Sequence, residues 1–280
     1  MKRLHSVSRT IGLSVTLPVA LTFSGLAQAA MQAAPAPEPR SSTTMPRWAS
    51  DDPIANEGVI EDGAIDAIKE MSNYLMSLKT IGISTQGSMD AVTADGQRIQ
   101  MEGTTTYKVR RPGFVIDYNS DIKSRRFVYD GKNFTVYSPK LGFYASAPAP
   151  ATNREVLDTI YTKFGISLPL EDLFRWGEGS HADRIQALKS AYEVGSATID
   201  GVPTDHFAFR EANVDWEVWI QKGDQPLPRK LVIVDRTDPA RPTFTTRLQW
   251  QVNPTFTDAD FAFVPDANAK QIQLATYKGE

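Results

Sequence analysis

Apolar and polar residues alternate with a period of two over most of the chain, and this pattern constrains the fold more than any other feature. In the clearest run, Phe244, Leu248 and Trp250 share one face, while Arg247 and Gln249 share the other. Successive side chains of a strand point to opposite faces of a sheet, so the run predicts a strand with one dry and one wet side. Such strands are typical of antiparallel sheets that cover an apolar interior on one side only.

Asp-Gly pairs separate the alternating runs at Asp95-Gly96, Asp130-Gly131 and Asp200-Gly201. Tight hairpin turns need positive φ angles, which glycine adopts freely and aspartate tolerates. The runs and the turns together predict a long antiparallel meander.

Two segments depart from the period of two and predict helices. At about 61–79, apolar residues such as Ile68 and Leu75 recur at three- and four-residue spacing and form one stripe. A helical insertion is expected at about 152–176, with Val156 and Ile160 on one face. Because apolar stripes must be buried, we expect these helices to cover the dry side of the sheet. The predicted fold class is therefore α+β, with a curved antiparallel sheet.

The N-terminus has the layout of a secretory signal peptide. Lys2, Arg3 and Arg9 are basic, Ile11–Phe23 is mainly apolar, and Ala27-Gln28-Ala29 fits a small-residue cleavage site. The apolar stretch is shorter than the roughly 20 residues that a membrane-spanning helix needs. We therefore predict export of a soluble chain that has no stable membrane anchor.

The chain divides into a signal peptide at 1–29, a disordered leader rich in Ala, Pro and Ser at 30–57, and a single domain at 58–280. Cleavage removes three basic residues and no acidic ones, which changes the formal net charge from −3 to about −6. A mildly acidic chain gives no argument for nucleic-acid binding.

The residue inventory argues against an enzyme and against a metal centre. The chain has no cysteine, and only His181 and His206 remain after cleavage, so we expect no metal and no cofactor. No Gly-x-Ser-x-Gly nucleophile motif occurs, and we predict no catalytic residues.

The region around His206 is the only place that suggests acid–base chemistry, because Asp205, Asp215 and Glu217 lie close in the sequence. Strand alternation places His206 on the outer face, opposite the neighbouring phenylalanines. The preferred interpretation is a salt bridge from the carboxylates to Arg229 or Lys230 on a neighbouring strand.

Several motifs resemble known periplasmic families. The segments Tyr107–Phe114, Tyr129–Pro139 and Phe261–Ile272 are similar to motifs of the periplasmic lipoprotein carrier LolA and its relatives. Four further segments resemble an uncharacterised family of predicted bacterial periplasmic proteins in the same superfamily: Phe164–Leu173, His206–Arg210, Asp215–Ile220 and Pro226–Leu231.

The resemblance implies a periplasmic location and an incomplete, strongly curved antiparallel β-barrel whose concave apolar side is covered by helices. Relatives hold acyl chains or glycolipids in that cavity. Function inferred in this way is an analogy from the fold, since one fold serves many functions.

Two sets of side chains are candidates for ligand contact. The first would line the cavity, although each member could equally pack against the covering helices: Phe114, Ile116, Tyr129, Phe134, Val136, Trp216, Val218, Leu248 and Trp250. The second would meet an anionic headgroup at the cavity mouth, or else form ordinary surface charge: Arg111, Arg125 and Arg126.

The leading hypothesis is a non-enzymatic periplasmic carrier or chaperone that binds a lipid or another hydrophobic small molecule. Opening of the cavity would need the helix at 61–79 or the insertion at 152–176 to move, and Gly165 and Pro169 favour a hinge in the insertion. A lipoprotein or another envelope protein is a further candidate partner, and a monomer is expected. The alternative hypothesis is a cell-envelope interaction or sensor module that uses the same fold without a bound lipid.

Overall fold

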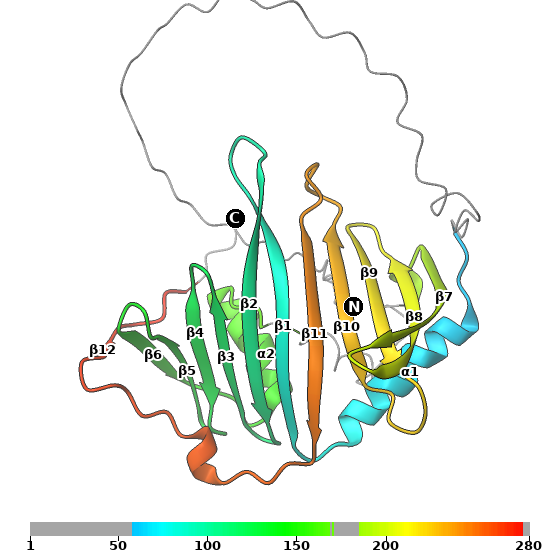
Figure 1. Cartoon of the computed structure of the whole chain (residues 1–280). Coiled ribbons are helices and arrows are strands. Elements are labelled where there is room, and N and C mark those ends of the chain that lie inside the picture. Colours follow the sequence, from blue (N-terminus) through cyan, green and yellow to red (C-terminus); the bar gives the residue numbers. More distant parts are fainter. Residues whose placement is uncertain (1–57, 169, 171–184, 277–280) are drawn as a thin grey trace, which may run out of the picture. The chain divides into compact units, whose positions relative to one another are not determined.

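The computed structural model describes residues 58–168, 170 and 185–276. The predicted signal peptide and leader lie outside the described residues, as do residue 169 and residues 171–184, which include the end of the predicted helical insertion. The described chain forms a curved, unclosed, twelve-stranded sheet accompanied by helices (Figure 1). This confirms the predicted α+β class. No helix among these residues is both long enough and apolar enough to cross a membrane.

The strands follow the spatial order β12-β6-β5-β4-β3-β2-β1-β11-β10-β9-β8-β7. Their bounds are β1 (Ile81–Val92), β2 (Arg98–Val109), β3 (Phe114–Ser120), β4 (Ser124–Tyr129), β5 (Asn133–Ser138), β6 (Phe143–Pro148), β7 (Ser190–Ile199), β8 (Val202–Arg210), β9 (Val214–Gln221), β10 (Pro228–Asp235), β11 (Thr243–Val252) and β12 (Lys270–Gln271). All neighbours are antiparallel except β12, which pairs in parallel with β6.

The long strand β1 lies at the centre of the sheet and pairs with β2 on one side and β11 on the other. We call β2–β6 the first wing and β7–β11 the second wing (Figure 1). Each wing is a meander of consecutive strands, as the alternating sequence runs predict.

The Asp-Gly pairs form the hairpin turns that join β1 to β2, β4 to β5 and β7 to β8, as predicted. Gly96, Gly131 and Gly201 have φ angles of 87°, 101° and 79°. Asp200 also has a positive φ, at 49°. Positive φ at both central residues, as at Asp200-Gly201, is characteristic of a type I′ hairpin turn. The backbone twist of this turn matches the right-handed twist of the strands that it joins.

Both α-helices lie against the same side of the sheet, which we call the inner face. Helix α1 (Asp62–Ser77) matches the predicted helix at 61–79 and buries its apolar stripe, including Ile68 and Leu75. Helix α2 (Asn153–Phe164) confirms the first part of the predicted insertion. Thr152 caps α2 by accepting a hydrogen bond from a backbone N–H, and Gly165 ends the helix with a φ of 66°.

The main core joins the two helices to the inner face of both wings. The alternation predicts its members correctly: Phe244, Leu248 and Trp250 of β11 belong to this core or pack against it, whereas Arg247 and Gln249 are exposed on the other side. Burial of one face of an antiparallel sheet is the expected consequence of such alternation.

The outer face of the first wing is crossed by the C-terminal segment, residues 253–272, which we call the C-terminal strap (orange to red in Figure 1). Its short 3-10 helix η2 (Asp258–Phe261) places the fully buried Phe261 against Val115 and Val128. Arg110 lies 4.1 Å from the Phe261 ring centroid. The strap therefore adds a second, smaller core on the opposite side of the sheet.

Candidate ligand-binding face

The predicted cavity-lining residues of the first wing form a packed aromatic block. The register places Tyr129 between Phe114 and Phe134, and the Phe114 ring centroid lies 5.5 Å from Tyr129 and 6.3 Å from Phe134. The hydroxyl of Tyr129 donates to the Pro150 carbonyl at 2.6 Å. Burial raises the pKa of Tyr129, and the charges of Asp130 and a nearby glutamate add to the effect.

Six of the nine predicted lining residues are almost completely buried in the main core. Their exposed fractions are 5% or less, and they are Phe114, Ile116, Tyr129, Phe134, Val218 and Leu248. These side chains contact the protein's own helices and neighbouring strands. Ligand contact for any of them stays a prediction.

The other three, Val136, Trp216 and Trp250, are only partly buried. The Trp216 ring stacks on Phe209, with centroids 3.9 Å apart, and its N–H donates to a glutamate carboxylate at 3.3 Å. The ring N–H of Trp250 donates to the Pro228 carbonyl at 2.7 Å. Because the protein itself provides the polar partner of each indole, the remaining exposed ring surface is apolar.

Half-buried apolar side chains form a row across five strands of the inner face. Strand register aligns Met101, Met89, Phe244, Ile233 and Trp216 on β2, β1, β11, β10 and β9. All five are intermediate in exposure. We call this set the apolar row. Contiguous apolar surface of this kind is a common mark of a ligand or partner site.

Sequence reasoning identified only Trp216 of this row as a candidate. The alternation assigns Phe244 to the dry side, but the row exists only because the register pairs Met89 with Phe244 on one side and with Met101 on the other. Strand pairing over such sequence separations is not encoded in a local pattern. Methionines at dry-side positions were the one available signal, since flexible methionines are common on adaptable binding surfaces.

The three predicted headgroup contacts do not lie together. Arg125 belongs to the inner face, whereas Arg126 points to the outer face and bonds both carboxylate oxygens of Asp117 at 2.6 and 2.9 Å. Arg111 lies in the β2–β3 turn and donates to the Met76 carbonyl near the end of α1 at 2.6 Å. The structure therefore does not bring these guanidinium groups to one cavity mouth.

A pocket of about 330 Å³ lies on the outer face, between β2–β4 and the C-terminal strap. Its lining includes two ion pairs, Lys108–Asp260 at 2.7 Å and Arg126–Asp117 at 2.6 Å. Each of these charges already has a partner in the pocket, so the geometry assigns no ligand to it. A cavity behind the inner face stays a prediction.

His206 lies on the outer face, as strand alternation predicts. Its Nε2 is 2.8 Å from a Glu217 carboxylate oxygen, and its ring stacks on Trp219 with centroids 3.8 Å apart. The ammonium group of Lys230, a predicted partner of the carboxylates, instead lies over the Trp219 ring, 4.1 Å from its centroid. This packing is a surface cluster without a candidate nucleophile among the contacts described.

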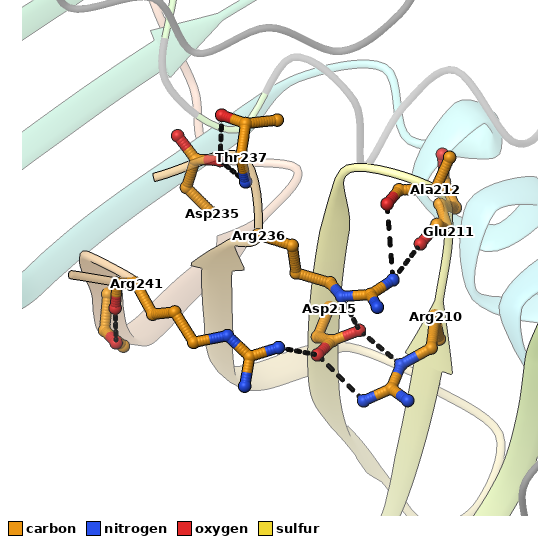
Figure 2. A network of polar contacts seen from close by, with 9 residues as sticks. Arg210, Glu211, Ala212, Asp215, Asp235, Arg236, Thr237 and Arg241 are labelled. Atoms are coloured by element: carbon orange, nitrogen blue, oxygen red, sulfur yellow. Dashed lines mark hydrogen bonds and ion pairs between the residues drawn. The ribbon is translucent and has the colours of Figure 1, made fainter. Parts of the chain in front are cut away.

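Asp215 belongs to a separate network, which Figure 2 shows. It accepts two hydrogen bonds from Arg210, at 2.7 and 3.0 Å, and lies 3.6 Å from Arg236 and 3.9 Å from Arg241. The predicted ion pair with Arg229 is wrong, because the Arg229 guanidinium donates to the side-chain amide oxygen of Gln221 on β9 instead. The network ties the β10–β11 hairpin to the β8–β9 turn, which indicates a structural role.

The described residues contain no group of three or more His, Cys, Asp or Glu side chains placed to hold a metal ion. The candidate site among the described residues is the apolar row on the inner face.

Comparison with known proteins identifies a family whose model matches the sequence. A family model described as "Predicted periplasmic protein (DUF2092)" matches residues 64–275. No curated protein matches the chain.

Solved structures with a similar chain arrangement are distant. An uncharacterised conserved protein from Thermus thermophilus has a TM-score of 0.45 and 11% identity, covering 76% of this chain and 99% of that one. The Mycobacterium tuberculosis lipoprotein LppX has a TM-score of 0.42 and 13% identity, covering 70% and 99%. A putative outer membrane lipoprotein-sorting domain from Vibrio parahaemolyticus has a TM-score of 0.30 and 10% identity, covering 71% and 97%.

Proposed function

Because the chain belongs to the family of predicted periplasmic proteins (DUF2092), we propose that it is a periplasmic carrier that holds a lipid or acyl chain against the inner face of its sheet. The carrier is non-enzymatic, and it requires no cofactor. The observation that carries the proposal is the apolar row, which presents half-buried side chains from five adjacent strands.

The composition of the apolar row suits an alkyl chain. Its members are two methionines, one aliphatic and two aromatic residues, and none is charged. Transfer of a methylene group from water to such a surface stabilises the complex by about 0.8 kcal/mol. A chain of roughly a dozen carbons can therefore offset the costs of association and ordering, which are several kcal/mol.

A movement of the helices that pack on the inner face would widen access to the row. Helix α2 ends at Gly165, whose left-handed conformation lets the chain change direction sharply. We place one hinge there, while the predicted second hinge residue, Pro169, lies outside the described residues. Helix α1 is less suited to opening, because its stripe is buried along most of its length.

A second candidate function is supported by the burial of the remaining predicted lining residues. Six of them are buried in the protein's own core, which favours a module that binds an envelope protein without a lipid. The two functions differ in what co-purifies with the protein, a lipid in one case and a protein in the other.

The carrier proposal is tested by binding of a fluorescent fatty acid to the purified chain and by mass spectrometry of solvent extracts. We expect a bound lipid in the extract. We also expect roughly tenfold weaker fatty-acid binding by Ile233→Lys, because the substitution places an ammonium group in the path of the alkyl chain.

Val232→Lys is the matched control, since Val232 is the preceding residue of β10, is also half-buried, and points to the outer face. Thermal unfolding establishes that both variants fold. Equal fatty-acid affinity of the two variants, or a wild-type chain that neither carries lipid nor binds the fatty acid, contradicts the carrier proposal. Capture of a periplasmic protein by the lipid-free chain then favours the second candidate.

A further inference from the structure

Exposed apolar side chains gather at two neighbouring hairpin tips of the first wing. Ile122 in the β3–β4 turn is 62% exposed, and Leu141 in the β5–β6 turn is 64% exposed. Phe143, which follows at the start of β6, is 40% exposed. Both turns lie at the same end of the wing (Figure 1). Single exposed apolar residues are common on protein surfaces, but exposed apolar residues that gather in one patch mark an interaction site.

A direct contact holds the two tips side by side. The Lys140 ammonium, from the β5–β6 turn, donates to the carbonyls of Ser120 and Asp121 in the β3–β4 turn, at 3.2 and 3.4 Å. Ile122 and Leu141 are therefore adjacent parts of one surface, which we call the twin tips (residues 120–125 and 138–143).

The twin tips carry positive charge on a chain whose formal net charge is −3. Lys123, Arg125 and Lys140 are basic, and Asp121 is the single acidic residue of the two segments. The Asp121 carboxylate turns back to accept a hydrogen bond from the Glu102 backbone N–H at 3.0 Å. The exposed apolar side chains are thus flanked by lysines.

The environment of Lys123 reflects this concentration of positive charge. Partial burial lowers the pKa of its ammonium group, and the nearby Arg125 lowers it further. A nearby anion would offset the second effect, because an opposite charge favours the protonated form.

The other described turns at this end of the sheet do not combine large apolar residues with basic residues. The β1–β2 turn (93–97), the β8–β9 turn (211–213) and the β10–β11 turn (236–242) contain no Ile, Leu, Val, Met or aromatic residue. The first two carry an acidic residue and no basic one. The pattern is therefore specific to the twin tips rather than general to the turns.

We propose that the twin tips dock on an anionic phospholipid bilayer, with Ile122 and Leu141 inserted at the interface and Lys123 and Lys140 against the phosphate headgroups. Aliphatic insertion combined with lysine–phosphate attraction is how peripheral proteins bind membranes reversibly. The proposal does not depend on lipid binding at the apolar row, so either can fail while the other holds.

Co-sedimentation with vesicles tests the docking. We expect the wild-type chain to bind vesicles of phosphatidylglycerol and phosphatidylethanolamine, to bind neutral phosphatidylcholine vesicles at least tenfold more weakly, and to dissociate as salt is raised. Ile122→Ser with Leu141→Ser should lower binding to the anionic vesicles at least tenfold, since it removes the inserted groups. Both residues are exposed, so the double variant should keep the wild-type unfolding temperature.

Val59→Ser is the matched control, because Val59 is 41% exposed beside β7, at the opposite edge of the sheet. It should bind vesicles like the wild type. The proposal is overturned if the double variant binds as well as Val59→Ser, if neutral vesicles bind equally well, or if the wild type binds neither kind. A double variant that only changes the oligomeric mass in solution also overturns it, since the tips would then meet a second copy of the chain.

Discussion

At the scale of single residues, Asp260 illustrates how charges fix the C-terminal strap to the sheet. Its carboxylate bonds the Lys108 ammonium at 2.7 Å and accepts hydrogen bonds from the backbone N–H and hydroxyl of Thr257 at 2.9 Å. These donors, Lys108 first, hold the pKa of Asp260 well below its usual range. The folded state therefore favours the ionised form of the Asp260 carboxyl group.

The pH dependence of stability follows from this lowered pKa. A carboxyl group with a depressed folded pKa stabilises the fold above its unfolded value of about 3.9, and the contribution is lost as pH falls toward the folded value. Asp260→Asn should therefore lower the unfolding temperature at pH 7, and the difference from wild type should narrow below about pH 4. Thermal melts across this range measure the effect.

Asp258→Asn is a suitable comparison in the same 3-10 helix. Asp258 pairs with Arg110 at 2.5 Å, but its side chain is 96% exposed, and exposed pairs contribute little. We expect it to change the unfolding temperature less than Asp260→Asn. Equal effects of the two variants, or a difference between wild type and Asp260→Asn that is as large at pH 2 as at pH 7, would show that the Lys108 contact is unimportant.

At the scale of elements, the two glycines Gly63 and Gly165 should respond in opposite ways to the same substitution. Gly165 ends α2 with a φ of 66°, whereas Gly63 lies in the first turn of α1, where an added Cβ would meet only open space. Gly165→Ala should destabilise the chain by about 1 kcal/mol, since alanine is strained in the left-handed region. Gly63→Ala should stabilise it by about 0.5 kcal/mol through a less flexible unfolded chain.

Chemical denaturation measures both changes as shifts of the unfolding midpoint at constant slope. Gly165→Asn adds a control, because asparagine tolerates the left-handed region better than alanine and should recover part of the loss. Destabilisation by Gly63→Ala, or none by Gly165→Ala, would contradict this account of how the helices begin and end.

Elements were predictable where their signals are local. The strand faces follow from alternation, as Phe244 against Arg247 illustrates, and the Asp-Gly turns and both helices follow from short patterns. The bidentate partner of Asp215, Arg210, is local, since it lies across the short β8–β9 turn. The contacts with Arg236 and Arg241 were not predictable, because they depend on how the β10–β11 hairpin folds back toward β9.

At the scale of the whole molecule, the C-terminal strap and the apolar row could not be predicted from the sequence, and the physical reason is the same for both. Phe261 reaches Val115 and Val128 across more than half of the described chain, and Met89 meets Phe244 only through strand register. Both depend on long-range pairing, which a local period does not specify. The degree of burial on the inner face depends in turn on where the helices lie, so buried and half-buried candidates looked alike in the sequence.

The central claim is that an alkyl chain lies along the apolar row, and methionine methyl NMR tests it most directly. With 13C-methyl methionine and a nitroxide-labelled fatty acid, we expect the methyl signals of Met89 and Met101 to broaden selectively. Met71, which is 1% exposed on the buried stripe of α1, provides the internal comparison. Signals of Met89 and Met101 that stay unchanged at saturating fatty acid would contradict the claim.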